Sequence, residues 1–397
     1  MKQIVHLIFT LEVGGSENMM IDIANEQAQY ADVSIILINN KFSAELIRRI
    51  NPSVNFFSLR REEGNKRSIR FLIKLWTLLL RKRPDVIHCH NHQIIRLLPF
   101  YKSRAVLTVH CVKIPSMHFA RYKKVYSISE AVAAEVKKRS GISSTVVTNG
   151  INFRAITIKS MEHVTARRDI NLFDSSPAST STHNPVKSGT KSRYADTAEA
   201  ESLQADLPTI RLVQLARLKH EMKGQDLLLV ALRQLLDHSP DHQFTVDFIG
   251  SGKSEAYLRS MTADLGLTDF VSFLGDKQRS WIYNNLHSYD ILVHPSRYEG
   301  FGLAMIEGIA AGLPVIASDE PGPRELLSGK PTAHLFSSGN ANDLAEVIRK
   351  LSHQIRVSGI NQLCEVSRSI ANEQYSVQQT ALQYMSHYST DLKQRNN

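Results

Sequence analysis

The chain has 397 residues, of which 42% are hydrophobic and 22% are charged, as is typical of a soluble globular protein. A length above that of most single cores predicts two domains. Three scattered cysteines argue against a disulfide framework, and no uninterrupted apolar stretch is long enough to span a bilayer. We therefore expect a cytoplasmic protein, with peripheral contact at the inner face of the cell membrane as an open alternative.

The formal net charge of +10 belongs to the N-terminal part of the chain. Residues 1–150 hold 23 lysines and arginines against 11 acidic residues. Such a basic region suits nucleic acid, an anionic membrane surface or a phosphorylated substrate. Nucleic acid is disfavoured, because the cations are not interleaved with aromatic residues or placed on a recognisable binding module.

Short apolar runs alternate with helical patterns or polar loops over residues 2–150, which indicates parallel strands covered by helices. The predicted strands are Ile4–Phe9, Val33–Ile38, Val54–Leu59, Asp85–His90, Ala105–His110, Val125–Ile128 and Thr145–Thr148. After the first strand, Gly14 and Gly15 form a turn, and Ser16 is the expected N-cap of a helix with Glu17 in its first turn. A doubly wound sheet binds ligands at this position, although an ordinary turn explains two glycines equally well.

Residues 68–83 predict a helix that Pro84 ends. Its polar stripe consists of Arg70, Lys74, Thr77 and Arg81, and apolar side chains occupy most of the rest. A core helix with one solvent-exposed edge is the favoured interpretation. The alternative is an interfacial helix that contacts anionic lipid.

Histidines gather at the ends of two predicted strands, at His88, His90 and His92 and at His110. Alternate residues of a strand share a face, so a metal site has to be considered. No carboxylate or Cys-x-x-Cys spacing accompanies these histidines. Polar residues that line a cleft at the carboxyl ends of strands are the better interpretation, and we predict no metal site.

The pattern changes after residue 157. Residues 158–208 are rich in Ser, Thr, Ala and Asn and lose all periodicity, which predicts a linker or a partly disordered insertion. They separate an expected first domain, residues 1–157, from an expected second domain, residues 209–372.

The second domain opens with a strand at Thr209–Leu215, a cationic loop and a strongly periodic helix. Arg217 and Lys223 on this loop could clamp a diphosphate, Arg through its planar fork and Lys as a point charge. Exposed surface cations are the alternative. Further strands are predicted at Phe244–Ile249, which leads into Gly250, and at Val271–Gly275, and residues 341–355 and about 360–392 are predicted to be helical.

The most informative stretch runs from His294 to Glu325 and has the pattern strand, glycine loop, helix, strand. Gly300 and Gly302 let a ligand approach the N-terminus of the helix, whose unpaired N–H groups and dipole favour an anion. Glu299 precedes the helix and Glu307 lies inside it. The two carboxylates could therefore bind different hydroxyls of one elongated anionic ligand, such as a nucleotide sugar.

On these residues the chain closely resembles glycosyltransferase family four, whose signature is a glutamate, seven residues and a second glutamate, here Glu299 and Glu307. Nearly the whole chain shares the resemblance, through Gly14–Glu17, Thr108–His110, Ser129–Val132, Asn149–Ile151, Arg217, Lys223–Gly224 and Gly250–Gly252. It implies the α/β GT-B fold, in which two Rossmann-like doubly wound domains face each other across a cleft. Residues 373–397 would form a C-terminal helix that packs back on the N-terminal domain.

The resemblance also implies roles for single residues. Arg217 and Lys223 would neutralise the donor diphosphate, Glu307 would hold the ribose hydroxyls and Glu299 the donor sugar. His110 and the glycine loop at Gly14 and Gly15 would lie across the cleft near the reacting sugar, and Phe301, Gly302, Leu303 and Gly250 would contribute to the donor site. No Asp-x-Asp occurs in the sequence, which fits a site without metal or cofactor.

The resemblance implies a retaining transferase that moves a sugar from a nucleotide diphosphate donor to a saccharide or lipid-linked saccharide. Bacterial surface polysaccharide or lipopolysaccharide biosynthesis is the expected setting, because a basic N-terminal half suits a membrane-proximal acceptor. A GT-B nucleotide-sugar epimerase and a non-catalytic saccharide-binding or partner subunit are the alternatives. The pairs Glu299 with Glu307 and Arg217 with Lys223 argue against both.

Overall fold

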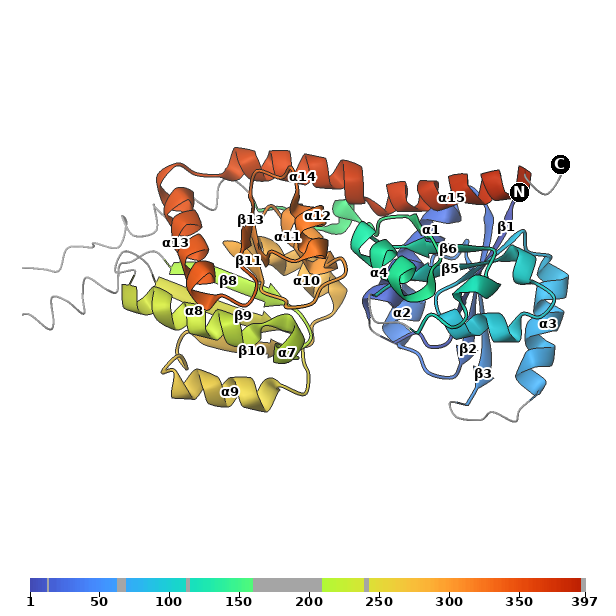
Figure 1. Ribbon diagram of the computed structural model, residues 1–397, viewed down its shortest axis with the longest axis horizontal. Coiled ribbons are helices and arrows are strands. Elements are labelled where there is room, and N and C mark those ends of the chain that lie inside the picture. Colours follow the sequence, from blue (N-terminus) through green and yellow to red (C-terminus); the bar gives the residue numbers. More distant parts are fainter. Residues whose placement is uncertain (13, 63–68, 112–114, 160–208, 239–242, 394–397) are drawn as a thin grey trace, which may run out of the picture.

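The computed structural model describes residues 1–12, 14–62, 69–111, 115–159, 209–238 and 243–393, which form two parallel sheets with their covering helices (Figure 1). This arrangement confirms the predicted fold class. The predicted insertion at residues 158–208 lies almost entirely outside the described residues. Within the described ranges, no helix is both long and apolar enough to cross a membrane.

The first sheet has seven strands in the order β3-β2-β1-β4-β5-β6-β7. They are β1 (Gln3–Ile8), β2 (Asp32–Asn39), β3 (Asn55–Arg61), β4 (Val86–Cys89), β5 (Ala105–Val109), β6 (Lys124–Ser127) and β7 (Thr145–Val146). The helices α1 (Gly15–Gln27), α2 (Ala44–Arg48), α3 (Arg70–Lys82) and α4 (Glu130–Ser140) accompany them. The strand order reverses between β1 and β4, so the loop after β1 opens at a switch point, where such sheets bind ligands.

The second sheet has six strands in the order β10-β9-β8-β11-β12-β13. They are β8 (Thr209–Leu215), β9 (Gln243–Ile249), β10 (Val271–Gly275), β11 (Ile291–His294), β12 (Val315–Ser318) and β13 (Ala333–Phe336). Its helices are α7 (His220–Lys223), α8 (Gln225–His238), α9 (Glu255–Asp264), α10 (Arg279–Asn285), α11 (Leu303–Ala310), α12 (Pro321–Leu327) and α13 (Ala341–Val357). The edge strand β13 was not predicted, because its four residues have no marked apolar run.

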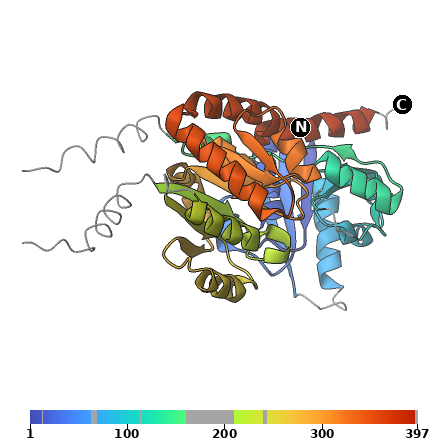
Figure 2. The ribbon, with the colours of Figure 1, turned by 60° about the vertical axis from the view of Figure 1, so that its left-hand side comes forward.

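The predicted helix over residues 360–392 is two helices, α14 (Asn361–Tyr375) and α15 (Val377–Lys393). They separate at Ser376, where the chain pairs with Ile151: the Ile151 amide donates to the Tyr375 carbonyl at 2.8 Å, and the Val377 amide donates to the Ile151 carbonyl at 3.0 Å. Figure 1 shows α14 over the second sheet and α15 over the first, where α15 packs along α1, and Figure 2 shows the same two red helices end to end.

Candidate active site

A cavity of about 680 Å³ lies between the two sheets, where loops leave the carboxyl ends of their strands. Its volume is in the range of pockets that bind small molecules. Every site residue predicted from the sequence lines this cavity: Gly14, Gly15, His110, Arg217, Lys223, Gly250, Glu299, Phe301, Gly302, Leu303 and Glu307. The structure thus brings these residues together, and their individual roles remain predictions.

Glu299 is held on both carboxylate oxygens. Its Oε2 accepts from Lys223 Nζ at 2.6 Å and lies 2.9 Å from His294 Nε2, while its Oε1 accepts from the Gly300 amide at 3.1 Å. Burial alone would raise the pKa of Glu299, but the His294 hydrogen bond and the Lys223 charge outweigh burial and hold this pKa well below its usual range. Glu299 is therefore an anion that the protein keeps in one orientation.

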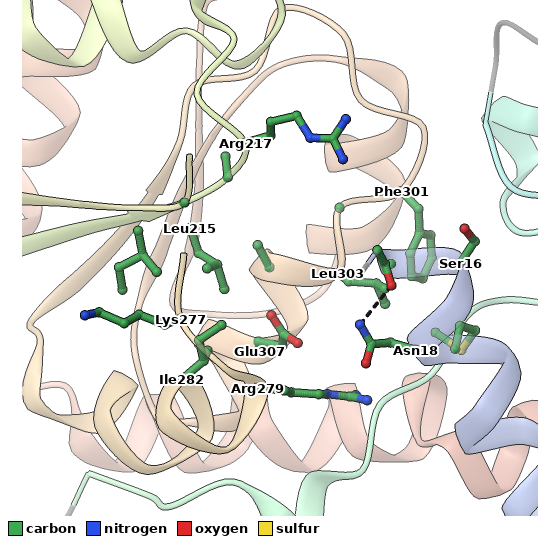
Figure 3. Close-up of a pocket in the computed structure, with 18 of the residues that line it drawn as sticks. Ser16, Asn18, Leu215, Arg217, Lys277, Arg279, Ile282, Phe301, Leu303 and Glu307 are labelled. Atoms are coloured by element: carbon green, nitrogen blue, oxygen red, sulfur yellow. Dashed lines mark hydrogen bonds between the residues drawn. The ribbon is translucent and has the colours of Figure 1, made fainter. Parts of the chain in front are cut away.

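The two predicted cations differ in their surroundings. Lys223, at the end of α7, forms the ion pair with Glu299, and its side chain is about a quarter exposed. Arg217 lies on the loop after β8 and is exposed. In Figure 3 its guanidinium extends from that loop above the cavity. Lys223 thus has a protein partner, whereas the Arg217 side chain is exposed at the cavity.

The helix α11 presents its N-terminus to the cavity without a side-chain cap. Gly302 precedes this helix with φ of +91°, and a Cβ there would lie 2.3 Å from Met305 Cε. The left-handed backbone favours glycine here, whereas the flexible end of Met305 could move away from a Cβ. Gly302 has no side chain to cap the first amides of α11, so this helix start is a favourable place for an anion, although the Met305 amide already donates to the Gly302 carbonyl at 3.0 Å.

Glu307 and Arg279 lie next to each other at the floor of the cavity (Figure 3). Burial raises the pKa of Glu307 to about 7, although the Arg279 charge partly opposes that rise. Arg279, on α10, forms an ion pair across the cavity with Asp22 of α1, and Asp22 also pairs with Arg49 at 2.7 Å. The sequence analysis missed Arg279 and Asp22, since neither belongs to a motif and 257 positions separate them.

The glycine turn at Gly14 and Gly15 forms the opposite wall. The prediction that Ser16 caps α1 is wrong: Gly14 is the N-cap, α1 begins at Gly15, and the Ser16 hydroxyl donates to Glu17 at 2.7 Å. Asn18 Nδ2 donates to the Gly14 carbonyl at 2.8 Å (Figure 3). A Cβ on Gly15 would lie 3.6 Å from Leu303 Cδ1, so this turn touches the second sheet's α11.

The histidines at the strand ends divide into two groups. Among the described residues, His110 lines the cavity, whereas His88 and His6 are fully buried beneath it, against the expectation of cleft-lining histidines. Ligand atoms of His6, His88 and His90 lie within 4.8 Å of one another, close enough for a metal ion. All six of their ring nitrogens nevertheless have hydrogen-bond partners, so hydrogen bonding alone accounts for the cluster.

Further contacts close the two halves around the cavity. The Ser129 hydroxyl donates to the Gly300 carbonyl at 2.7 Å, which ties the start of α4 to the loop before α11. The Glu325 carboxylate accepts a hydrogen bond from the Glu130 amide at 3.1 Å. Its negative charge there interacts favourably with the positive end of the α4 dipole. These contacts fix Glu299 and Gly300 relative to the first sheet.

Comparisons with known proteins agree with this geometry. The sequence model described as Glycosyltransferase Family 4 matches residues 13–154, and the one described as Glycosyl transferases group 1 matches residues 196–357. The chain is 34% identical to the amylovoran biosynthesis glycosyltransferase AmsK of Erwinia amylovora, over 36% of each protein. It is 30% identical to the lipopolysaccharide core biosynthesis mannosyltransferase LpsB of Rhizobium meliloti, over 40% of this chain and 46% of LpsB. These alignments span about a third to a half of the length of those relatives.

A crystal structure of Anabaena Alr3699/HepE in complex with UDP and glucose is similar to the whole fold, with a TM-score of 0.70 at 19% identity, covering 98% of this chain and 100% of that one. The two family matches fall on the two sheets, and the cavity between those sheets holds the paired glutamates. The chain therefore belongs to glycosyltransferase family 4 and has the GT-B fold.

Proposed function

We propose that the chain transfers a sugar from a nucleotide diphosphate sugar to a hydroxyl of a saccharide or lipid-linked saccharide, with retention of anomeric configuration. Bacterial surface polysaccharide or lipopolysaccharide biosynthesis is the proposed setting, as the names of AmsK and LpsB suggest. One observation carries the proposal: the cations Arg217 and Lys223, the carboxylates Glu299 and Glu307 and an uncapped helix N-terminus all line a single cavity. Such a set suits a diphosphate with a hydroxyl-rich group at each end.

The donor is proposed to lie along the cavity wall that the second sheet provides. Leu215 and Ile282 would contact the base, and Glu307 would accept hydrogen bonds from the ribose hydroxyls (Figure 3). The diphosphate would then meet Arg217, Lys223 and the start of α11. The complex of Alr3699/HepE with UDP and glucose supports a donor of this class.

Cleavage of the glycosidic bond puts negative charge on the leaving phosphate, so fixed cations and a helix dipole stabilise the transition state more than the ground state. Lys223 and Arg217 line the cavity, and we propose that they stabilise this charge without a metal ion. Glu299 would hold the sugar rather than attack it, because a carboxylate hydrogen-bonded on both oxygens is a stabilised anion and a weak nucleophile. Same-face attack, with the departing phosphate taking the acceptor's proton, follows from this assignment.

The first sheet is proposed to bind the acceptor, and α3 to contact an anionic membrane surface that carries it. The apolar residues Ile69, Ile73 and Leu80 are 66%, 57% and 67% exposed along one stripe of this helix. At 100° per residue, the exposed cations Arg70, Lys74 and Arg81 form the adjacent stripe. Nearby Phe100 is 77% exposed and packs edge-on against Trp76. Apolar and basic stripes side by side are typical of interfacial helices.

Liposome flotation tests the membrane contact. We expect the protein to bind vesicles that contain anionic lipid and to lose that binding when Ile73→Glu and Leu80→Glu are combined. The matched control combines Leu363→Glu and Val366→Glu, which place the same charges on exposed apolar positions of α14. Equal binding of the α3 variant and the wild type would remove the membrane role from α3.

A thermal-shift screen against nucleotides and nucleotide sugars tests the donor site, because a ligand that binds only the folded state raises Tm with its concentration. We expect a nucleoside diphosphate to raise Tm, and its sugar conjugate to be hydrolysed slowly without acceptor. Lys223→Ala should abolish that hydrolysis. A free epimerised nucleotide sugar as the product would instead indicate the epimerase, and binding without turnover would indicate a non-catalytic subunit.

A further inference from the structure

A chain of hydrogen bonds connects Gln27 of α1 with His110 at the cavity. Gln27 Oε1 lies 2.8 Å from His6 Nε2, His6 Nδ1 lies 3.0 Å from His90 Nε2, and His90 Nδ1 lies 3.2 Å from His110 Nε2. The remaining nitrogen, His110 Nδ1, is buried and has no hydrogen-bond partner among the described residues. Gln27 and His6 are both fully buried and do not line the cavity.

His6 and His90 have to be neutral for their hydrogen bonds to form, since each uses one nitrogen as an acceptor and a doubly protonated imidazole has none. Burial supports neutrality: it lowers the pKa of His6 and of His110 to about 4 and that of His90 well below its usual value. A neutral imidazole has one donor and one acceptor nitrogen. Fixing the proton at one end of the chain therefore fixes it at the other.

The direction of the chain follows from Gln27. Its Oε1 is an acceptor, so His6 carries its proton on Nε2 and offers an unprotonated Nδ1. That Nδ1 accepts from His90 Nε2, and His90 Nδ1 in turn accepts from His110 Nε2. The unprotonated nitrogen of His110 is consequently Nδ1, the one ring nitrogen of these three histidines without a hydrogen-bond partner among the described residues.

A second set of contacts anchors the neighbouring His88 independently. Its Nε2 lies 2.7 Å from Thr108 Oγ1, and its Nδ1 lies 2.7 Å from the Tyr388 hydroxyl of α15. The His88 ring stacks on His90 with centroids 4.4 Å apart. Both of its nitrogens are occupied by Thr108 and Tyr388 rather than by nitrogens of the chain. His88 thus packs the chain from the side without setting its direction.

We infer that Gln27 and His6 are positioning residues that hold His110 in the Nε2–H tautomer, so that Nδ1 accepts a hydrogen bond from a hydroxyl of the bound sugar. The identity of that ligand rests on the proposed function, whereas the tautomer does not. An unpaired buried acceptor is unfavourable, and a ligand hydroxyl relieves that cost. His110 in this tautomer would favour sugars that present a hydroxyl donor at this point of the cavity.

The tautomer is measured directly by long-range ¹H–¹⁵N NMR on the full chain labelled with ¹⁵N-histidine, with the His110 signals assigned by their loss in His110→Asn. We expect His6, His90 and His110 all to be protonated on Nε2. Gln27→Glu should preserve this pattern, since a carboxylate is also an acceptor, whereas Gln27→Met should give mixed tautomers at His110. Tyr384→Phe is the matched control: it removes a buried hydroxyl that bonds to Thr108 in the same cluster and should leave the His110 tautomer unchanged.

Steady-state kinetics then separate positioning from folding. We expect Gln27→Met to lower kcat/KM roughly fivefold, the factor that one net hydrogen bond is worth, and to have no further effect in a His110→Ala background. Gln27→Glu should restore most of the loss. Protonation of His110 on Nδ1 in the wild type, or an equal effect of Gln27→Met with and without His110, would overturn the inference. Because the NMR measurement needs no substrate, it tests the tautomer even if no nucleotide sugar is found that the protein accepts as a donor.

Discussion

Lys223 and Glu299 form a close ion pair in the candidate site, with 2.6 Å between Nζ and Oε2. The pair gives Lys223 a fixed position next to the start of α11, where the leaving phosphate is proposed to lie. A cation held in advance stabilises developing charge without the cost of reorganising at the moment of reaction. Glu299 in turn keeps its charge because His294 and Lys223 both bind it.

Removal of the Lys223 ammonium group should therefore act on catalysis more than on folding. We expect Lys223→Ala to lower kcat about 10²- to 10³-fold, as the loss of one transition-state donor does in other enzymes. Lys253→Ala is the control, because Lys253 carries the same charge, pairs with Glu221 and does not line the cavity. Equal loss of kcat in both variants would show that only the general charge of this region matters.

Glu307 should make nucleotide binding depend on pH. Burial raises the pKa of its carboxyl to about 7, and ribose hydroxyls that donate to the carboxylate favour the ionised form. Nucleotide binding and loss of this proton are then coupled, so the affinity should rise as pH increases through about 7. Calorimetric titrations with a nucleoside diphosphate at pH 6 and pH 8 measure the change. Since the phosphate also titrates, the same titrations are repeated on Glu307→Gln, and the part of the pH dependence that this variant loses is assigned to Glu307. An equal pH dependence of the affinity in both proteins would contradict this role.

The same pKa has a consequence for stability. A carboxyl whose pKa is raised in the folded state binds its proton more tightly there than in the unfolded chain. Its contribution to the free energy of unfolding is present below the ordinary pKa of a glutamate and is lost as pH rises through about 7. Glu307→Gln should abolish this loss, which urea titrations at a series of pH values between 4.5 and 8 would detect.

At the scale of elements, the short helix α7 and the helix α8 meet at Gly224. This glycine has φ of +66°, and a Cβ on it would lie 1.9 Å from the Pro295 carbonyl oxygen. The close approach brings the end of α7, and with it Lys223, against the loop after β11. The turn therefore sets the distance between Lys223 and Glu299.

Gly224→Ala tests this turn. Gly266 has the same φ of +66° but has nothing within 4 Å of its position for a Cβ, so Gly266→Ala measures the backbone cost alone. We expect Gly224→Ala to destabilise the protein by at least about 2 kcal/mol more than Gly266→Ala, which is the scale of overpacking in a dense contact. Chemical denaturation of both variants gives the comparison. Equal free energies of unfolding would show that the loop after β11 moves away from the added methyl group at little energetic cost.

The strands and the glycine loops could be predicted because their signals are local. The run at Thr209–Leu215 is a strand with the predicted bounds, and Glu299 and Glu307 stand at a fixed spacing around a helix start. The break between α14 and α15 could not be predicted, because helical periodicity continues across Ser376 and the pairing partner is the distant Ile151. The N-cap at Gly14 was missed for a related reason: a serine next to an acidic residue favours a cap locally, but here its hydroxyl binds Glu17.

At the scale of the whole molecule, contacts between residues far apart in the sequence hold the two sheets around the cavity. Asp22 of α1 pairs with Arg279 of α10, and both side chains are mostly buried, at 12% and 15% exposure. α15 adds a second connection by packing along α1. No sequence motif marks these contacts, since only the folded arrangement brings their members together.

Loss of the Asp22 charge should loosen this arrangement in the unliganded protein. Asp22→Asn leaves Arg279 without its ionic partner and Arg49 with a weaker one, so the balance should shift toward a more open molecule. Small-angle X-ray scattering should show a larger radius of gyration than in the wild type, and a nucleoside diphosphate should reduce the difference. Asp237→Asn, which breaks an exposed pair within α8, should leave the radius unchanged. A wild-type radius in Asp22→Asn would show that α15 and the apolar contacts suffice.

The most direct test of the account follows the transferred sugar. The full chain is incubated with a panel of nucleotide sugars and a saccharide acceptor, and NMR identifies the released nucleotide and the anomeric configuration of the product. The account predicts a nucleoside diphosphate and a glycoside with the configuration of the donor, both lost in Lys223→Ala and strongly reduced in Glu299→Gln. An inverted product, or transfer that neither variant affects, would contradict it.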